Sequence, residues 1–485
     1  MKRPILLAAF VITVLQSATA QTGEKWDLRR CVEYALQHNI SIRTQDITAR
    51  LSELTYKQSK ASQLPNFNFG INTGFRFGLA ENPTTGVFEN NNIFNTGLGL
   101  QSQVTLFNWF SEKNQVESDR INAEADKEQV KKIQNDVALN VAVAYLQILL
   151  AREQVKLATA QVDITRAQLG DTRKRVDAGV LPELNAAEIE AQLARDSSLM
   201  ISAVGSEQQF LLQLKAILNL DAAAPFDVVT PPVDKIPVEP LADLLPENVF
   251  ASAIANLPQQ KVNELRVMSA KKFAESAKGR MYPSINASGS LYSNYVSFKD
   301  RPVYNQTVSG YTSSGLRTNV AGTYYDVERP ILVNSNTIAY LIKPDPFGSQ
   351  LKNNFGQNIG ISLNVPIFNG RSARTNWEKA KLNITQFELR KEQDEMQLKQ
   401  DIYNAYNDAM VALQKFNADK RAVSTAETSY DYAKKRYDLN LLSSFELINS
   451  QTNLERTRYQ ALYSQYDYLF KIKLLEFYKG QGLKL

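Results

Sequence analysis

The residue types that most often carry chemistry are scarce in this chain of 485 residues. It has one histidine, His38, and one cysteine, Cys31. A metal centre of several His or Cys side chains, or a catalytic pair of thiol and imidazole, therefore lacks the residues it needs. No Gly-Lys-Ser/Thr phosphate loop occurs, and the methionines are too scattered for a row of copper ligands. We expect no catalytic site, cofactor or metal, and interpret His38 as a surface or capping residue.

The N-terminus has the pattern of a secretory signal. Lys2 and Arg3 precede an apolar run, Ile5–Leu15, and the small residues Ala18–Ala20 follow. We therefore expect residues 1–20 to be a signal peptide. Cys31 follows charged residues instead of the small apolar residues of a lipid-attachment site, so lipid attachment is not indicated. The formal net charge of +5 falls by two without the signal, which is too close to neutral to indicate a nucleic-acid partner.

Four segments alternate apolar and polar residues with a period of two. They are Phe67–Leu79, Leu98–Leu106, Ile285–Tyr295 and Ile359–Ile367. Each is long enough for a tilted strand that crosses a membrane, which needs roughly 9 to 11 residues. By contrast, the most apolar stretch after the signal, 137–151, is shorter than the roughly 20 residues of a spanning helix. The segments therefore predict either membrane-spanning strands or a half-buried sheet of a soluble protein.

Two long stretches lack residues that break helices. Residues 111–177 contain no proline and one glycine, and residues 372–439 contain neither. We expect helices of about 100 Å, far longer than the average globular helix. Apolar residues of the first stretch form two stripes on opposite sides of the helix. The stripes include Val137, Val141, Ala144 and Ile148, and Leu139, Ala142, Leu146 and Leu149. Two opposed stripes suit a helix in the wall of a tube, although the interior of a bundle is an alternative.

The second half of the chain repeats the first. A shift of 261 residues places Val104 on Val365 and Lys174–Arg175 on Lys435–Arg436 without a gap. A shift of 218 aligns the start of each half, so the second half has an insertion between its two strands. Each repeat reads helix, strand, loop, strand, very long helix, turn and helix. We expect repeats at 21–224 and 247–485, a Pro-rich connector at 225–246, and polar loops at about 80–95 and 299–355.

Short motifs at the passages between these elements resemble the TolC family of outer-membrane efflux proteins. They are Leu64–Asn66 and Tyr282–Ser284 before strands, Val104–Asn108 and Val365–Asn369 after strands, and Arg436–Leu447 at a tip. The resemblance covers the whole chain after the signal. It implies a mixed α and β membrane protein, a homotrimer in which each chain gives four strands to one twelve-stranded β-barrel, continued by a twelve-helix α-barrel. Because four strands alone cannot enclose a barrel, chains must also associate on physical grounds.

The resemblance further implies a passive exit duct of a tripartite efflux or type I secretion system. Such a duct sits in outer-membrane lipid, extends helices through the periplasm and exposes loops outside the cell. It docks on a periplasmic adaptor protein and an inner-membrane pump, is not an enzyme, and opens by partner-driven untwisting of its tip helices. The alternative is a structural, envelope-spanning coiled coil with a soluble β cap and no channel.

The turns that follow the two long helices are the candidate entrance. Gly179 and, in the second repeat, Asn440 stand where a left-handed helix cap is wanted, a conformation that both residue types tolerate. The family resemblance implies that these tips contact the adaptor; without a partner, each would be an ordinary helix hairpin. The adaptor candidates are Lys174, Arg175, Gly179, Val180 and Leu181, with Lys435, Arg436, Asn440, Leu441 and Leu442.

The resemblance also assigns residues to the closed entrance. Relatives often have two acidic rings there; Glu446 matches the first, but Asn449 stands at the second. One ring of three carboxylates would favour cations and raise the proton affinity of its members. The alternative is that Glu446 is an ordinary solvated helix residue. Some relatives also have a clasp of Tyr, Asp and Arg. Tyr437 matches the Tyr, whereas Asn185 and Leu442 occupy the other positions, so we expect no charge-assisted clasp.

Overall fold

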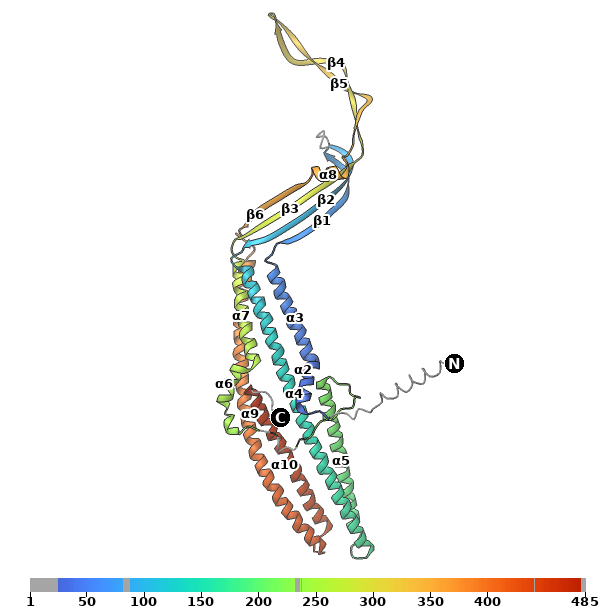
Figure 1. Cartoon of the computed structure of the whole chain (residues 1–485), viewed down its shortest axis with the longest axis vertical. Coiled ribbons are helices and arrows are strands. Elements are labelled where there is room, and N and C mark those ends of the chain that lie inside the picture. The colour runs from blue at the N-terminus through green and yellow to red at the C-terminus, as the bar shows by residue number, and fades with distance from the viewer. Residues whose placement is uncertain (1–24, 82–87, 232–235, 237, 440, 481–485) are drawn as a thin grey trace, which may run out of the picture. The chain divides into compact units, whose positions relative to one another are not determined.

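The computed structural model describes residues 25–81, 88–231, 236, 238–439 and 441–480 (Figure 1). The predicted signal peptide, part of the Pro-rich connector and the tip residue Asn440 lie outside the described residues. The helices are α2 (Leu28–His38), α3 (Ile40–Ala61), α4 (Ser111–Asp177), α5 (Glu183–Leu218), α6 (Pro246–Asn256), α7 (Pro258–Gly279), α8 (Phe347–Asn353), α9 (Ser372–Asp438) and α10 (Ser444–Tyr478). The strands are β1 (Asn66–Glu81), β2 (Phe88–Phe107), β3 (Ser284–Phe298), β4 (Arg301–Val320), β5 (Thr323–Ile342) and β6 (Gly356–Asn364).

The same order of elements occurs twice along the chain. Helices α4 and α9 have 67 residues each, and they begin 261 residues apart, the shift found in the sequence. The passages from strand to long helix also share an unusual backbone. Trp109 and Phe110 have φ angles of 53° and 61°, and Gly370 and Arg371 both have 63°. Because residues other than glycine rarely adopt positive φ, the two passages have one specific conformation in common.

Four strands form one antiparallel sheet in the order β1–β2–β3–β6. Directly opposed residues of antiparallel strands lie on the same face. The register opposes apolar residues, as in Phe69, Leu100 and Leu291 across β1, β2 and β3, and Ala287 and Ile361 across β3 and β6. The other face is polar, with Asn68, Gln101, Ser290 and Asn358 side by side. Within the paired strands, the apolar sets of the four predicted segments therefore share one face, up to the irregularity between Thr105 and Phe107 in β2.

The structure corrects the expected loops and strand ends. Strand β2 already begins at Phe88, inside the expected loop 80–95. Strand β6 ends at Asn364 instead of Ile367, because Pro366 has no N–H for a sheet ladder. The insertion 299–355 is not a plain loop, since β4 and β5 pair with each other as a two-stranded ribbon and α8 follows. Register irregularities in this ribbon, such as Ser313/Leu316, interrupt the period of two and hide the strands in the sequence.

The chain divides into two compact units. One comprises Met1–Lys57, Val116–Ala274 and Glu378–Leu485; the other comprises Gln58–Gln115 and Glu275–Trp377 and contains the strands. Each unit draws on both predicted repeats, and the repeat boundaries stay a prediction. In the helical unit, Ser52 of α3 bonds Asp126 of α4. Helix α4 contacts α7 through the hydroxyl groups of Ser118 and Ser269, which lie 2.9 Å apart. Helix α7 in turn contacts α9, because Asn263 donates to Asp394 (3.0 Å). These contacts arrange the four helices in one row, α3–α4–α7–α9.

The largest apolar cluster of the helical unit surrounds the middle of α4. Both predicted stripes contribute, including the fully buried Val141, Ile148 and Leu149, and they pack against α2 and α5. By length and composition α4 is also the one described helix that could cross a membrane, but its apolar stretch lies in this cluster. His38 ends α2 at the surface, where its ring stacks on Tyr34 and Nδ1 donates to the Tyr34 carbonyl oxygen (3.0 Å).

Candidate functional site

Two helical hairpins meet in the helical unit. The first hairpin consists of α4 and α5, and the second of α9 and α10 (Figure 1). Near the turns, the hydroxyl groups of Tyr437 and Thr172 lie 3.2 Å apart, and Ser444 Oγ donates to Glu188 Oε2 (3.0 Å). Tyr437 is buried. The predicted clasp tyrosine therefore does touch the other hairpin, but its bonded partner is the neutral Thr172, and Asn185 is only half-buried near the start of α5.

The two turns close in the same way. Gly179 has a φ of 73°, the left-handed conformation predicted for it. The amide of Val180 donates to the carbonyl oxygen of Arg175 (2.9 Å), and that of Leu441 donates to Arg436 (2.8 Å). These two bonds lie one repeat apart. Asn440, the predicted counterpart of Gly179, is outside the described residues. The hydrogen bond between its neighbours Leu441 and Arg436 is nevertheless present.

The tips expose both apolar and cationic side chains. Val180 and Leu441 are 57% and 65% exposed. Lys174 and Lys435 form exposed ion pairs with Asp171 and Asp431 of their own helices. Among the other adaptor candidates, Arg436 is exposed, whereas Arg175, Leu181 and Leu442 are half-buried. Sequence reasoning missed the neighbouring Leu184, Leu439 and Phe445, which are also exposed and extend the apolar surface.

Glu446 closes the N-terminus of α10. Its backbone N–H donates to Ser443 Oγ (3.2 Å), and its Oε2 accepts from the Ser443 N–H (3.1 Å). These bonds to Ser443 lower the pKa of the Glu446 carboxyl. Such a capping box has a sequence signature, Ser-x-x-Glu, which could have predicted it. Glu446 and Asn449 are both exposed, and a ring built from Glu446 stays a prediction because it needs other chains.

A buried polar cluster joins the two hairpins farther from the turns. Thr165 of α4 is its centre: Oγ1 donates to Asp196 Oδ2 of α5 (2.6 Å) and accepts from Gln161 (3.1 Å) and Gln451 of α10 (3.0 Å). Asp196 Oδ1 accepts from Gln192 (2.7 Å). These five residues are buried. The sequence did not reveal the cluster, because single polar residues on long helices look the same whether they face solvent or another helix.

Glu455 completes the buried polar cluster. It lies one turn beyond Gln451 on α10, and its Oε1 is buried without a hydrogen-bond partner. Gln451 Oε1 is also buried and unpartnered. Burial raises the pKa of the Glu455 carboxyl to about 8, and the charge of Asp196 adds to the effect. The buried polar cluster thus holds one titratable group whose pKa lies near physiological pH.

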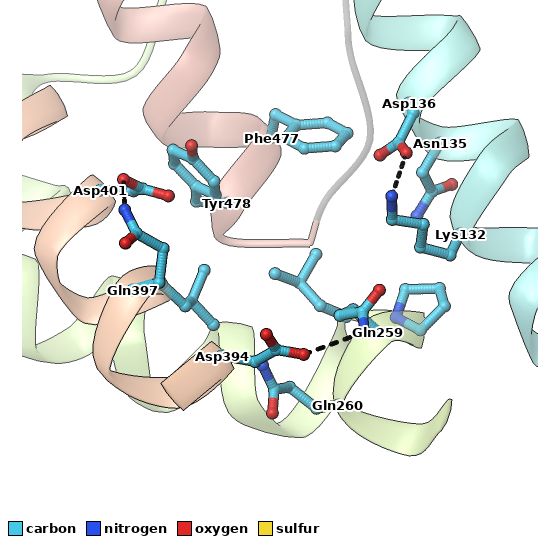
Figure 2. Close-up of a pocket in the computed structure, with 13 residues that line it drawn as sticks. Lys132, Asn135, Asp136, Gln259, Gln260, Asp394, Gln397, Asp401, Phe477 and Tyr478 are labelled. Carbon is cyan, nitrogen blue, oxygen red and sulfur yellow. Dashed lines mark hydrogen bonds and ion pairs between the residues drawn. The ribbon is translucent and has the colours of Figure 1, made fainter. Parts of the chain in front are cut away.

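A pocket of about 350 Å³ lies where α10 ends and α7 begins (Figure 2). Its wall includes Asp394 of α9, which accepts from Gln259 (3.3 Å), and Asp136 of α4, which pairs with Lys132 (2.6 Å). Figure 2 shows Phe477 and Tyr478 across the pocket from Gln259 and Gln260. Two of its carboxylates are thus held by their neighbours. In the part of the chain that the structure describes, no three His, Cys, Asp or Glu side chains are grouped to hold a metal ion.

Known proteins resemble the chain in sequence. A family model described as "Outer membrane efflux protein" matches residues 31–220. Outer membrane protein TolC of Escherichia coli (strain K12) and that of Salmonella enteritidis are each 24% identical to the chain over 117 residues. The aligned stretch is 24% of this chain and 24% of each relative, so it spans about a quarter of their length.

Solved structures resemble the chain over nearly its whole length. CusC has a TM-score of 0.74 at 18% identity, and the match covers 96% of both chains. The Campylobacter jejuni CmeC outer membrane channel has a TM-score of 0.71 at 16% identity, covering 94% of this chain and 86% of that one. The Neisseria gonorrhoeae MtrE outer membrane channel has 0.68 at 17% identity, covering 94% and 89%. The fold is therefore shared with these channels.

Proposed function

We propose that the chain belongs to the TolC family of outer-membrane efflux proteins and is the outer-membrane exit duct of a tripartite efflux or type I secretion system. It would conduct substrates passively from an inner-membrane pump, through a periplasmic adaptor, to the exterior. The observation that carries this proposal is the register of the four-stranded sheet, which gathers the alternating apolar residues of all four predicted segments, such as Phe69, Leu100 and Leu291, on one face.

The apolar face of the sheet is exposed in the single chain. Phe67 and Phe77 of β1 are 71% and 72% exposed, and Ile359 of β6 is 91% exposed. Large apolar side chains in such numbers need a cover, and a lipid bilayer covers one face of a strand while water wets the polar other face. The polar row Asn68, Gln101, Ser290 and Asn358 suits a water-filled interior.

The edges of the sheet support a homotrimer. Strands β1 and β6 lie at the two ends of the sheet, so each offers an edge to another strand. A membrane leaves no backbone group unpaired, and four strands are too few to close on themselves. Three chains would form a closed barrel of twelve strands, and the row α3–α4–α7–α9 would likewise supply four helices of a twelve-helix tube.

The tips expose surfaces that suit the proposed partners. The exposed apolar residues Val180 and Leu441 beside Lys174 and Lys435 would contact the adaptor. Glu446 would contribute one carboxylate per chain to the entrance, where three like charges favour cations. The bonds between the hairpins, such as Tyr437 with Thr172, would hold the resting entrance and break when the tips untwist.

Planar-bilayer recordings of the purified protein test the proposed function. We expect stepwise conductance, with Glu446→Gln reducing the preference for cations, and trimers that only detergent extracts from cells. Purified trimers that never conduct would contradict the duct. Release of the protein by osmotic shock would instead support the structural coiled coil with a soluble β cap.

A further inference from the structure

Two carboxyl groups of the buried polar cluster have opposite surroundings. Asp196 accepts hydrogen bonds from Thr165 (2.6 Å) and Gln192 (2.7 Å), so its charged form is well satisfied. Glu455 Oε1 is buried and has no partner, and the same is true of Gln451 Oε1. A buried acceptor without a donor is costly, and a carboxylate can only accept. The ionised form of Glu455 therefore fits this environment poorly.

A proton on Glu455 supplies the donor that the two unpartnered acceptors lack. Gln451 and Glu455 are four residues apart on α10, a spacing that places them on the same face of the helix. Both unpartnered atoms are acceptors, so they cannot bond each other unless one carries hydrogen. A proton gives Glu455 an O–H that can donate to an acceptor such as Gln451 Oε1, and it removes the repulsion from the charge of Asp196. Since Asp196 is the carboxylate that already has donors, Glu455 is the member of the pair that holds the proton.

The other groups that face Glu455 leave this assignment in place. Two groups lower the pKa of Glu455: the side chain of Gln451, by a hydrogen bond, and the charge of Arg458. The guanidinium of Arg458, however, donates to Glu427 of α9 (2.7 Å). Tyr430 of α9 and Tyr459 of α10 are neutral, because burial and Glu455 raise the pKa of both. From α4 the uncharged Gln154 lines one pocket together with Glu455 and Tyr459. Burial and Asp196 outweigh the opposing groups, so that the pKa of Glu455 is about 8.

We propose that Glu455 is a proton-binding site between the two hairpins, and that loss of its proton loosens their contact and favours the open entrance. Its last step, the opening, rests on the proposed function; the protonation does not. The packed hairpins hold a proton that a solvated Glu455 releases, because the packed pKa lies above the ordinary carboxyl value. Packing therefore weakens as pH rises from the ordinary carboxyl range towards 8, and the loss is complete above that pH.

Infrared difference spectroscopy of the full-length protein tests the protonation. The difference between wild type and Glu455→Gln should contain the carbonyl band of a protonated carboxyl at pH 6, which disappears with a midpoint near 8. Asp196→Asn should move that midpoint to lower pH by removing the neighbouring charge, a shift that a merely structural role does not produce. Glu33→Gln, at an exposed carboxylate paired with Arg29, is the control and should remove no such band. Absence of the band at pH 6 overturns the proposal.

Channel recordings test the coupling to opening. Between pH 6 and 8 the open-to-closed ratio of the wild type should rise by up to about tenfold per pH unit for each Glu455 that becomes solvated. Glu455→Gln keeps the shape of the neutral acid, so its ratio should stay low and constant. If the infrared carbonyl band titrates but the open-to-closed ratio of the wild type does not change with pH, the proposed coupling between deprotonation and opening is wrong. A protein that never conducts contradicts the proposed function, whereas the infrared band still decides the protonation.

Discussion

The two helical hairpins have the same backbone plan but different stabilising groups. Their long helices are equal in length, and their turns close with the same bond one repeat apart. The N-cap of the next helix, however, is Pro182 in the first hairpin, with no side-chain cap bond, and Ser443 in the second, with a full capping box. The comparison teaches that the repeat preserves backbone geometry while the side chains that stabilise it have diverged.

The interiors of the two hairpins differ in the same sense. The fully buried Ile148 of α4 corresponds, at the shift of 261, to the fully buried Ala409 of α9. Arg152 of α4 donates to the carbonyl oxygen of Val228 in the connector and pairs with Glu207 (2.9 Å), whereas Leu413 stands at its place in α9. The first hairpin thus has a larger side chain and an extra cation at these positions, whereas the connector contacts both hairpins, since Glu239 also pairs with Lys479 at the end of α10 (2.9 Å).

The largest expected effect is at the apolar anchor of the first hairpin. Ile148→Ala should lower the stability of that hairpin by about 2–5 kcal/mol, because it opens a cavity in the largest cluster. Ala409→Gly, the matched change in the second hairpin, should cost about 1 kcal/mol. Hydrogen exchange of the α4 and α9 amides measures both. Equal losses in the two hairpins would contradict this difference in side-chain packing.

Arg152 gives the next largest effect. Arg152→Met should destabilise the first hairpin by about 2–4 kcal/mol, since it leaves the mostly buried Glu207 without its cation and the Val228 carbonyl without its donor. Leu413→Met is the matched control and should cost less than about 1.5 kcal/mol. Thermal unfolding of the full-length protein compares them. A stable Arg152→Met variant would show that the connector does not anchor the hairpin.

The pH dependence of local stability separates the hairpins further. Position 194 of α5, which corresponds to Glu455, is alanine, so only α10 carries this titrating group. Because the packed pKa of Glu455 is raised to about 8, protection of the α10 amides should fall as pH rises towards 8, after correction for intrinsic exchange. Glu455→Gln should abolish this slope. A slope that survives the substitution would assign it to another group.

The smallest effect concerns the helix caps at the turns. Ser443→Ala removes the side chain that accepts from the Glu446 N–H and should cost about 1 kcal/mol. It should also raise the pKa of Glu446 part of the way towards its ordinary value, because Ser443 Oγ donates to the Glu446 carboxylate (2.8 Å), whereas the bond from the Ser443 backbone N–H stays. Pro182→Gly serves as the comparison, as Pro182 makes no side-chain cap bond. NMR titration of Glu446 and exchange of the first α10 amides measure the two consequences.

The sequence predicted those parts of the fold that a single element determines by itself. Strict alternation located β1, and the absence of helix breakers located α4 and α9, whose ends match the prediction within a residue. Gly179 was correctly predicted as a left-handed cap, because glycine is the residue type that most readily adopts a positive φ angle. The β4–β5 ribbon was not predicted, because its register irregularities interrupt the alternation of apolar and polar residues.

The candidate site was harder to predict, because it depends on which helices meet. Tyr437 was singled out by resemblance, but its bond to Thr172 depends on the packing of α4 against α9. Thr165, Asp196 and Glu455 lie on three helices, and no spacing within one helix indicates that they share a buried cluster. Only the cap of Glu446 was available in the sequence, from Ser443 three residues earlier.

The central claim is that lipid covers the apolar face of the four-stranded sheet and water the other. In a background with Trp26, Trp109 and Trp377 changed to Phe, single tryptophans at positions 359 and 358 test it in bilayers. Ile359→Trp, on the apolar face, should be quenched by brominated lipid and protected from an aqueous quencher, and Asn358→Trp should show the reverse. Equal quenching of both positions by the aqueous quencher, with none by lipid, would contradict the account.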